Sequence, residues 1–150
     1  MNQDFKDLLA VFIKEGVRFL IVGGYAVIRH SEPRYTKDLD LWVATDAENA
    51  DRLFRALTDF GAPLGGLTPS DFTRPEYFYT MGQAPGRIDI LLGADGLEFE
   101  DCWTRRNAAM LGGSEIYYIS REDLITNKEA VGRLQDLADV EKLRDTRSEE

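Results

Sequence analysis

The pattern of hydrophobic positions predicts short strands alternating with helices. Apolar residues at a period of about 3.6 predict an amphipathic helix over residues 3–15, and Gly16 is a suitable end for it. Short apolar runs bounded by glycine or polar residues predict buried strands instead. The resulting order is helix, strand, helix, strand, helix, two strands, helix, strand and two helices, with strands near residues 17–22, 37–44, 76–81, 86–93 and 114–120.

This order predicts an α/β (α+β) fold in a single domain, residues 1–150. We expect a mixed, mostly antiparallel sheet of about four or five strands, with helices packed on it. The core of the fold spans about residues 17–92, and C-terminal helices occupy about residues 120–145. In the last helix, the spacing directs Leu137, Val140 and Leu143 inward.

One predicted strand, KDLDLWVA, carries two aspartates in an apolar run. Side chains alternate across a strand, so Asp38 and Asp40 share one face, together with Trp42. Two close carboxylates repel each other unless a cation lies between them, and Mg²⁺ prefers such oxygen ligands. The alternative is an edge strand with a solvated acidic face.

A third carboxylate favours the metal interpretation. Asp89 interrupts the later strand RIDILL, and Arg87 precedes it by two residues on the same face. If the two strands are neighbours, three carboxylates converge and suit two metal ions, which serve phosphoryl transfer. Arg87 would then be either an ion-pair partner or a substrate contact.

Two glycines lie where the first strand meets the next helix. At such a turn, Gly23 and Gly24 let the backbone approach a phosphate, which the free N–H groups of the helix would bind. The alternative is an ordinary turn. Arg34 and Lys37 follow before the aspartates, as phosphate contacts or as balancing charges.

Composition limits the partners. The chain has a net charge of −9, which disfavours non-specific nucleic-acid binding. It lacks an apolar run of the roughly 20 residues that a membrane span needs, so no membrane is expected. A single cysteine, Cys102, forms no internal disulfide, which favours a cytoplasmic location.

Taken together, VGGYAV, RYTKDLDLWV and RIDIL resemble the nucleotidyltransferase signature of the DNA polymerase beta superfamily, over roughly residues 20–92. The tail ISREDLITNKEAVGRLQDLADVEKL resembles the C-terminal helices of abortive-infection-type nucleotidyltransferase toxins and related small transferases. The resemblance implies the nucleotidyltransferase fold. It also implies metal ligands and catalytic residues at Asp38, Asp40 and Asp89, the last also as base, and nucleotide contacts at Gly23, Gly24, Arg34 and Lys128.

The implied activity is transfer of a nucleoside monophosphate from a nucleoside triphosphate such as ATP, with pyrophosphate leaving. The implied cofactor is Mg²⁺, as two ions, with Mn²⁺ as a substitute. The acceptor stays open among a protein side chain, a tRNA end and a small molecule such as an aminoglycoside or lincosamide. A protein partner or a second copy in a homodimer would complete the site.

Two other interpretations remain. The chain would be a non-catalytic nucleotide- or partner-binding member of this fold, such as a toxin–antitoxin component, or a structural domain with a solvated acidic face. Lys128 would then be a solvated lysine. We expect His30 at a helix end or in the core, and Asp136 and Asp139 as structural partners of Arg133 or Lys128.

Overall fold

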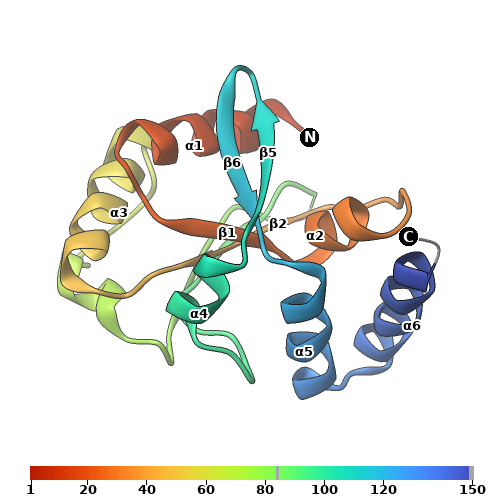
Figure 1. Cartoon of the computed structure of the whole chain (residues 1–150). Coiled ribbons are helices and arrows are strands. Elements are labelled where there is room, and N and C mark those ends of the chain that lie inside the picture. The colour runs from red at the N-terminus through yellow and green to blue at the C-terminus, as the bar shows by residue number, and fades with distance from the viewer. Residues whose placement is uncertain (84, 149–150) are drawn as a thin grey trace.

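The computed structural model describes residues 1–83 and 85–148, which form a mixed sheet of six strands with helices on both faces (Figure 1). The spatial order is β3-β4-β2-β1-β6-β5. β1 is antiparallel to β2 and parallel to β6, while β2 is parallel to β4, and two hairpins form the edges. The strands are β1 (Phe19–Val22), β2 (Leu39–Val43), β3 (Phe78–Met81), β4 (Ile88–Leu91), β5 (Asn107–Leu111) and β6 (Ser114–Tyr118).

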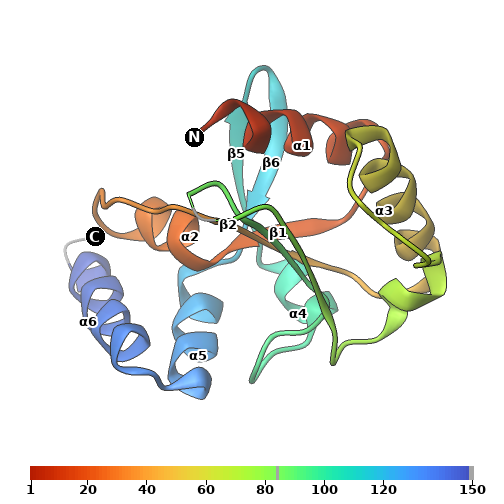
Figure 2. The ribbon, with the colours of Figure 1, turned by 180° about the vertical axis from the view of Figure 1, so that it is seen from behind.

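The helices form a layer on each side of the sheet (Figures 1 and 2). Residues of the first and third helices bury one face, and residues of the second, fourth, fifth and sixth bury the other. The helices are α1 (Gln3–Lys14), α2 (Gly23–His30), α3 (Ala47–Phe60), α4 (Phe99–Thr104), α5 (Arg121–Val131) and α6 (Leu134–Ser148), with a 3₁₀ helix at η1 (Pro69–Thr73).

Capping residues explain several helix ends. The side chain of Asp46 accepts the N–H of Asn49 and starts α3, and left-handed Gly61 ends it. Ser120 accepts the N–H of Asp123 in the same way and starts α5.

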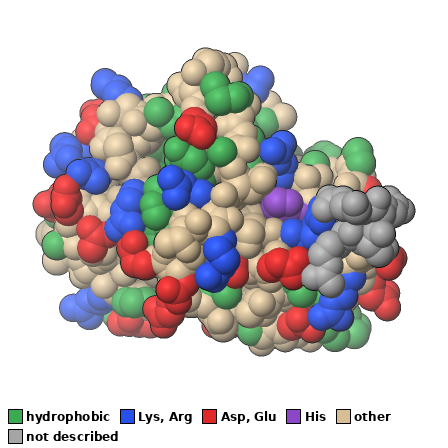
Figure 3. All heavy atoms as spheres, in the orientation of Figure 1, with side chains coloured by type: hydrophobic (Ala, Val, Ile, Leu, Met, Phe, Trp, Pro, Cys, Tyr) green, Lys and Arg blue, Asp and Glu red, His purple; other side chains and the backbone are tan. Residues whose placement is uncertain are grey.

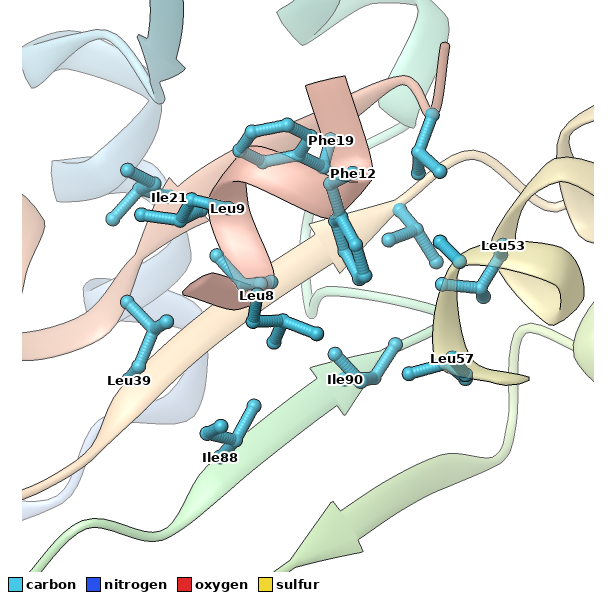
Figure 4. Close-up of a cluster of buried hydrophobic side chains, with 14 of the residues drawn as sticks. Leu8, Leu9, Phe12, Phe19, Ile21, Leu39, Leu53, Leu57, Ile88 and Ile90 are labelled. Carbon is cyan, nitrogen blue, oxygen red and sulfur yellow. The ribbon is translucent and has the colours of Figure 1, made fainter. Parts of the chain in front are cut away.

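The first hydrophobic core lies between the sheet and the helices α1 and α3 (Figure 4). Strand side chains at every second position point into it, and each fully buried aliphatic or aromatic side chain contributes roughly 1.5–3 kcal/mol. Its central members are Leu8, Leu9, Phe12, Phe19, Ile21, Leu39, Leu53, Leu57, Ile88 and Ile90.

The second core lies on the opposite face of the sheet. Leu20 and Trp42 alternate with the residues of the first core, and they pack with Cys102, Val140 and Leu143 from the other helical layer. Because Asp40 lies between Leu39 and Leu41 along β2, it shares this second face with Trp42.

The sequence predicted the order of these elements but too few strands. β5 was missed because NAAML lacks the β-branched and aromatic residues that mark a strand, and the turn at Gly112 and Gly113 pairs it with β6. The sheet is also less antiparallel than expected, since two of its five strand pairs are parallel.

The predicted inward face of α6 is only partly confirmed. Val140 and Leu143 are buried as expected, at 4% and 0% exposed, but the prediction for Leu137 is wrong because this side chain is 46% exposed. The α6 face that packs inward instead includes Asp136 and Asp139, whose carboxylates are buried against cations.

No helix in the described part of the chain has the length and hydrophobicity of a transmembrane span.

Candidate active site

The centre of the candidate site is a pair of aspartates on adjacent parallel strands. Asp40 on β2 lies directly opposite Asp89 on β4 in the strand register, and Asp38 immediately precedes β2. The hydroxyl of Thr80, opposite Asp89 on β3, donates a hydrogen bond of 2.9 Å to Asp89 Oδ1. The parallel pairing therefore brings the three predicted carboxylates to one end of the sheet.

The surroundings of Asp40 disfavour the ionised form of its carboxyl group. Burial is the largest of the effects that raise the pKa of Asp40 to about 7, and the nearby Asp89 and Asp38 carboxylates act in the same direction. The positive charge of Arg87 lowers the pKa of Asp40, but by less than burial and the two carboxylates raise it. The site therefore lacks positive charge at the point where Asp40 lies.

Arg87 lies between the other two carboxylates. Its Nη2 is 3.1 Å from Asp38 Oδ2, and its Nε is 3.3 Å from Asp89 Oδ2. The second contact lacks hydrogen-bond geometry, so Arg87 Nε is buried without a hydrogen-bond partner in the described structure. Asp38 Oδ1, the carboxylate oxygen that does not contact Arg87, is also buried without one among the described residues. Arg87 is 43% exposed at its side chain, which leaves it a route to solvent.

Gly23 permits a close approach between the backbone and Asp40. A Cβ at position 23 would lie 2.9 Å from Asp40 Cγ and closer still to Oδ2, and the φ angle of +65° also favours glycine. At the next position, a Cβ would lie 3.1 Å from Thr36 Cβ. Both glycines open α2, whose free N–H groups therefore lie beside the carboxylates.

Lys128 is buried in an ion-pair network at the side of the site. Its Nζ lies 3.2 Å from Asp136 Oδ1 and 3.0 Å from Asp139 Oδ2, and the lysine is 7% exposed. Burial alone would raise the pKa of Asp136 and Asp139, but hydrogen bonds from Lys128 and from Arg133 to Asp136 outweigh it and lower both. The two aspartates are thus ion-pair partners, as the sequence predicted.

Arg34 joins this network from the segment between α2 and β2. Its Nη1 lies 2.6 Å from Asp139 Oδ1. A cavity of about 360 Å³ is lined by Arg34, Lys128, Gly24 and Asp38, so the predicted phosphate contacts and the first aspartate face one space. Gly23 and Asp40 line this cavity too, and together with Asp89 and Lys128 they also line an adjoining cavity of about 380 Å³.

Trp42 has the orientation that strand alternation predicted, but it belongs to a further groove. This groove has a volume of about 600 Å³ and is lined by Trp42, Tyr77, Phe78 and Phe99, among others. Tyr77 and Phe78 are 50% and 67% exposed, so neither side chain lies in the core. They lie at the start of the edge strand β3, where one side faces solvent.

The sequence did not place Thr80 or Arg133 at the site, although Arg133 was expected as an ion-pair partner of Asp136 or Asp139. Thr80 orients Asp89, and strand pairing alone could have revealed it. Arg133 lines both cavities and donates to Asp136 at 2.7 Å. It follows Gly132, the left-handed residue that ends α5, and only the turn into α6 directs it toward the site.

Across residues 1–83 and 85–148, no group of three or more acidic, histidine or cysteine side chains is already arranged around a metal position. The donors nevertheless suit a hard divalent cation. Asp38 and Asp89 offer carboxylate oxygens, Asp38 Oδ1 is buried without a hydrogen-bond partner among the described residues, and Asp40 lies beside like charges. A cation would need Arg87 to move aside.

Comparison with known proteins identifies the fold. No protein-family model matches the sequence, and no curated protein has a significantly similar sequence. The structure is similar to the lincomycin-bound crystal structure of the lincosamide antibiotic adenylyltransferase LnuA, with a TM-score of 0.60 and 15% identity over 97% of this chain and 98% of that chain. A nucleotidyltransferase-like antigenic protein from Paracoccidioides brasiliensis aligns with a TM-score of 0.47 and 15% identity, over 95% of this chain and 75% of that chain.

The first of these similarities shows that the chain has the nucleotidyltransferase fold. At 15% identity it concerns the fold alone. The fold inferred from the VGGYAV, DLDLWV and RIDIL segments is thereby confirmed, while the relation to abortive-infection-type toxins stays a prediction.

Proposed function

We propose that this protein is a metal-dependent nucleotidyltransferase that moves a nucleoside monophosphate from a nucleoside triphosphate to an acceptor hydroxyl. The observation that carries this proposal is the direct pairing of Asp40 and Asp89 on parallel strands, beside the glycine turn that opens α2. Three carboxylates that repel one another have a clear use only if a cation is bound between them.

Asp38, Asp40 and Asp89 would hold the cation, which we propose to be Mg²⁺, as two ions, with Mn²⁺ as a substitute. When bound, the metal neutralises charge on the phosphates and lowers the barrier to displacement at the α-phosphorus. The raised pKa of Asp40 supports this assignment, because a bound cation would favour the ionised carboxylate.

The phosphate end of the nucleotide would lie over the start of α2. Gly23 and Gly24 begin α2, whose first N–H groups lack acceptors within the helix and are suited to bind phosphate oxygens. Arg34 and Lys128 add positive charge to the lining of the cavity that these glycines also line, and Arg133 is a third cation there. Each of these cations has a carboxylate partner that holds it in place before the substrate arrives.

Asp89 is suited to accept the proton of the acceptor. Thr80 occupies Oδ1, so Oδ2 is the oxygen that becomes available once Arg87 moves aside. The acceptor oxygen would form a bond to the α-phosphorus, the bond from the α-phosphorus to the pyrophosphate oxygen would break, and the proton would pass to Asp89 Oδ2. The balance is one nucleotidylated acceptor and one pyrophosphate.

The 600 Å³ groove is the proposed acceptor site. It shares Leu91 and Gly93 with the cavity that contains Asp40 and Asp89, so an acceptor there would meet the reacting phosphate. Aromatic side chains form part of its wall. Its charged lining residues are all acidic, namely Glu76, Asp95 and Glu98, and none of the three has a lysine or arginine partner within the described residues.

This lining favours a small, hydroxylated and positively charged acceptor over a tRNA end, whose phosphates the carboxylates would repel. The fold similarity to an adenylyltransferase whose structure holds lincomycin supports ATP with a small acceptor. The test is a transfer assay on a panel of amine-bearing polyols and on tRNA, with each triphosphate and Mg²⁺, read by the added mass of the monophosphate. Labelling of tRNA alone would contradict the assignment of the acceptor class.

A second candidate function rests on Arg87. Its guanidinium lies between Asp38 and Asp89, so it acts as a permanent cation if it never moves, and the chain would then bind nucleotide or a partner without catalysis. Electron paramagnetic resonance of Mn²⁺ distinguishes the two candidates. Depletion of the free Mn²⁺ signal by protein with ATP, beyond that by ATP alone, supports the enzyme, and an unchanged signal supports the binding domain.

A further inference from the structure

A second charged cavity lies away from the acidic site. It has a volume of about 410 Å³ and lies where the end of α2, the α4–β5 turn and the start of α5 meet. Four of its seven lining residues are arginines, at positions 29, 105, 106 and 121, and none is acidic. In a chain with a net charge of −9, this concentration of positive charge is a local exception. Lysine and arginine side chains lie near His30 on the face shown in Figure 3.

Aromatic rings hold two of these arginines in position. The guanidinium carbon of Arg106 lies 4.1 Å from the centre of the Trp103 ring and 4.6 Å from that of Tyr117. Arg29 lies 5.6 Å from the Tyr118 ring, and its Nε donates a 2.9 Å hydrogen bond to Asn107 Oδ1. Guanidinium groups fixed in this way lose little conformational entropy when they bind an anion.

The positive charge of this cavity is only partly neutralised. Arg105 forms two hydrogen bonds to the carboxylate of Asp123, at 2.9 and 3.0 Å. Within the described residues, Arg29 and Arg106 have no carboxylate partner: their polar contacts are Asn107 and the carbonyl oxygens of Ala108 and Trp103. Each of the two therefore keeps unused N–H donors.

The start of α5 lies at the same cavity. Ser120, the N-cap of this 11-residue helix, is one of the lining residues. The positive end of the helix adds to the field of the arginines. The N–H of Asp123 is already bound to Ser120 Oγ, so the arginines supply most of the binding capacity.

We infer that this cavity is a phosphate-binding site separate from the catalytic one. Fixed guanidinium groups match the geometry of phosphate oxygens, and the volume lies within the usual range for a ligand site. The two sites lie at opposite ends of α2, whose eight residues span about 12 Å. The phosphate belongs either to a free polyphosphate or to the backbone of an RNA, and both sources offer the same chemistry to the arginines.

Tryptophan fluorescence gives a test, because one of the two tryptophans of the chain, Trp103, contacts Arg106. The wild-type protein is titrated in EDTA at low salt with inorganic pyrophosphate and, separately, with an eight-residue oligouridylate. EDTA excludes metal-dependent binding at the aspartates, and a repeat with Asp38→Asn/Asp40→Asn shows that the two sites are independent.

Saturable binding that weakens at least tenfold in Arg29→Gln/Arg106→Gln supports the site. Arg29→Lys/Arg106→Lys, which keeps the charge, should retain part of the affinity, and Arg55→Gln/Arg74→Gln, outside the cavity, should bind as the wild type does. Circular dichroism confirms that the variants are folded. Binding of pyrophosphate alone identifies a free polyphosphate, and binding of the oligonucleotide alone identifies an RNA backbone.

Two results overturn the inference. One is an affinity for both probes weaker than about 1 mM, which is below the strength of ordinary non-specific contact with nucleic acid. The other is equal binding by Arg29→Gln/Arg106→Gln and the wild type, which would mean that the arginines only cover exposed aromatic rings.

Discussion

A Cβ on residue 23 would lie 2.9 Å from Cγ of Asp40, so Gly23 and Asp40 form a contact that only glycine permits without displacement. This contact joins the two halves of the proposed site. The turn that would bind phosphate and the carboxylate that would bind metal are in van der Waals contact, and a change at either one moves the other.

Substitution Gly23→Ala should therefore damage both stability and nucleotide binding. The φ angle of +65° disfavours alanine, and the new methyl group would displace the carboxylate of Asp40. We expect a loss of about 2 kcal/mol in the free energy of unfolding, from the usual cost of such backbone strain, and at least tenfold weaker ATP binding. Gly66→Ala is the matched control because position 66 is open and lacks a positive φ. Equal behaviour of the two variants in urea unfolding would contradict the contact.

Substitution Asp40→Asn should stabilise the metal-free protein, and more so at higher pH. The folded-state pKa of about 7 lies above the ordinary value of 3.8, so ionised Asp40 opposes folding. The loss of folding free energy caused by ionised Asp40 is small near pH 4, grows as the pH rises through 7 and reaches its full size above pH 7. Full ionisation costs at most about 4 kcal/mol at about 1.36 kcal/mol per pKa unit, and the coupling to Asp89 makes about 2 kcal/mol the expected gain.

Urea unfolding at pH 5 and pH 8 checks this prediction. The gain from Asp40→Asn should be larger at pH 8, whereas the exposed-site control Asp59→Asn should give no such difference. If Asp40→Asn raised the free energy of unfolding equally at both pH values, ionisation of Asp40 would be no harder in the folded protein than in the unfolded chain.

Substitution Lys128→Met should destabilise the protein strongly. It leaves the carboxylates of Asp136 and Asp139, which are 2% and 0% exposed, without their shared cation. Breaking a buried pair typically costs about 3 kcal/mol or more. Arg144→Gln, which breaks an exposed pair with Glu129, should cost less than about 1 kcal/mol.

The pH dependence provides a second measurement on this network. Because the pKa values of Asp136 and Asp139 are lowered, their contribution to stability is present above their ordinary pKa and is lost as the pH falls through the lowered values. Lys128→Met should therefore unfold at a higher pH than the wild type during acid titration. An unchanged acid midpoint would mean that Lys128 does not hold these carboxylates ionised.

Substitution Asp89→Asn should abolish transfer more completely than it weakens binding. Loss of a general base typically lowers the rate about 10²–10⁴-fold, while Asp38 and Asp40 remain to hold a cation. Thr80→Val should lower the rate less and alter its pH profile, because Thr80 only positions Asp89, and Thr80→Ser should restore the rate. Transfer rates and nucleotide affinities measured on the same preparations check the separation. A Thr80→Ser variant as impaired as Thr80→Val would contradict the positioning role.

The strands that carry the aspartates were predictable because side-chain alternation is a local property. The pattern in DLDLWV and RIDILL placed Asp40 and Trp42 on one face and Leu39 and Leu41 on the other, as the structure shows. The parallel pairing of β2 with β4 was not predictable in this way, since it depends on the path of the chain between them.

The burial of Lys128 was the main feature of this network that the sequence did not reveal, although its pairing with Asp136 or Asp139 was expected. A lysine on a helix usually extends into solvent, yet Lys128 is buried because Asp136 and Asp139 approach it from α6. The same two carboxylates explain why Leu137 faces outward, since the inward face of that helix is partly ionic. The position of Arg87 between Asp38 and Asp89 also became apparent only once the strands were paired.

The central claim, that the aspartates bind metal and the glycine turn binds nucleotide, is tested most directly by calorimetric titration of ATP into the wild-type protein and into Asp38→Asn/Asp40→Asn, each with and without Mg²⁺. GTP, CTP and UTP follow under the same conditions and give the base preference. The account predicts that the wild type binds at least one triphosphate only when Mg²⁺ is present, and that the variant, although folded, does not. Metal-independent binding that survives in the variant, or no binding of any triphosphate by the folded wild type, would contradict it.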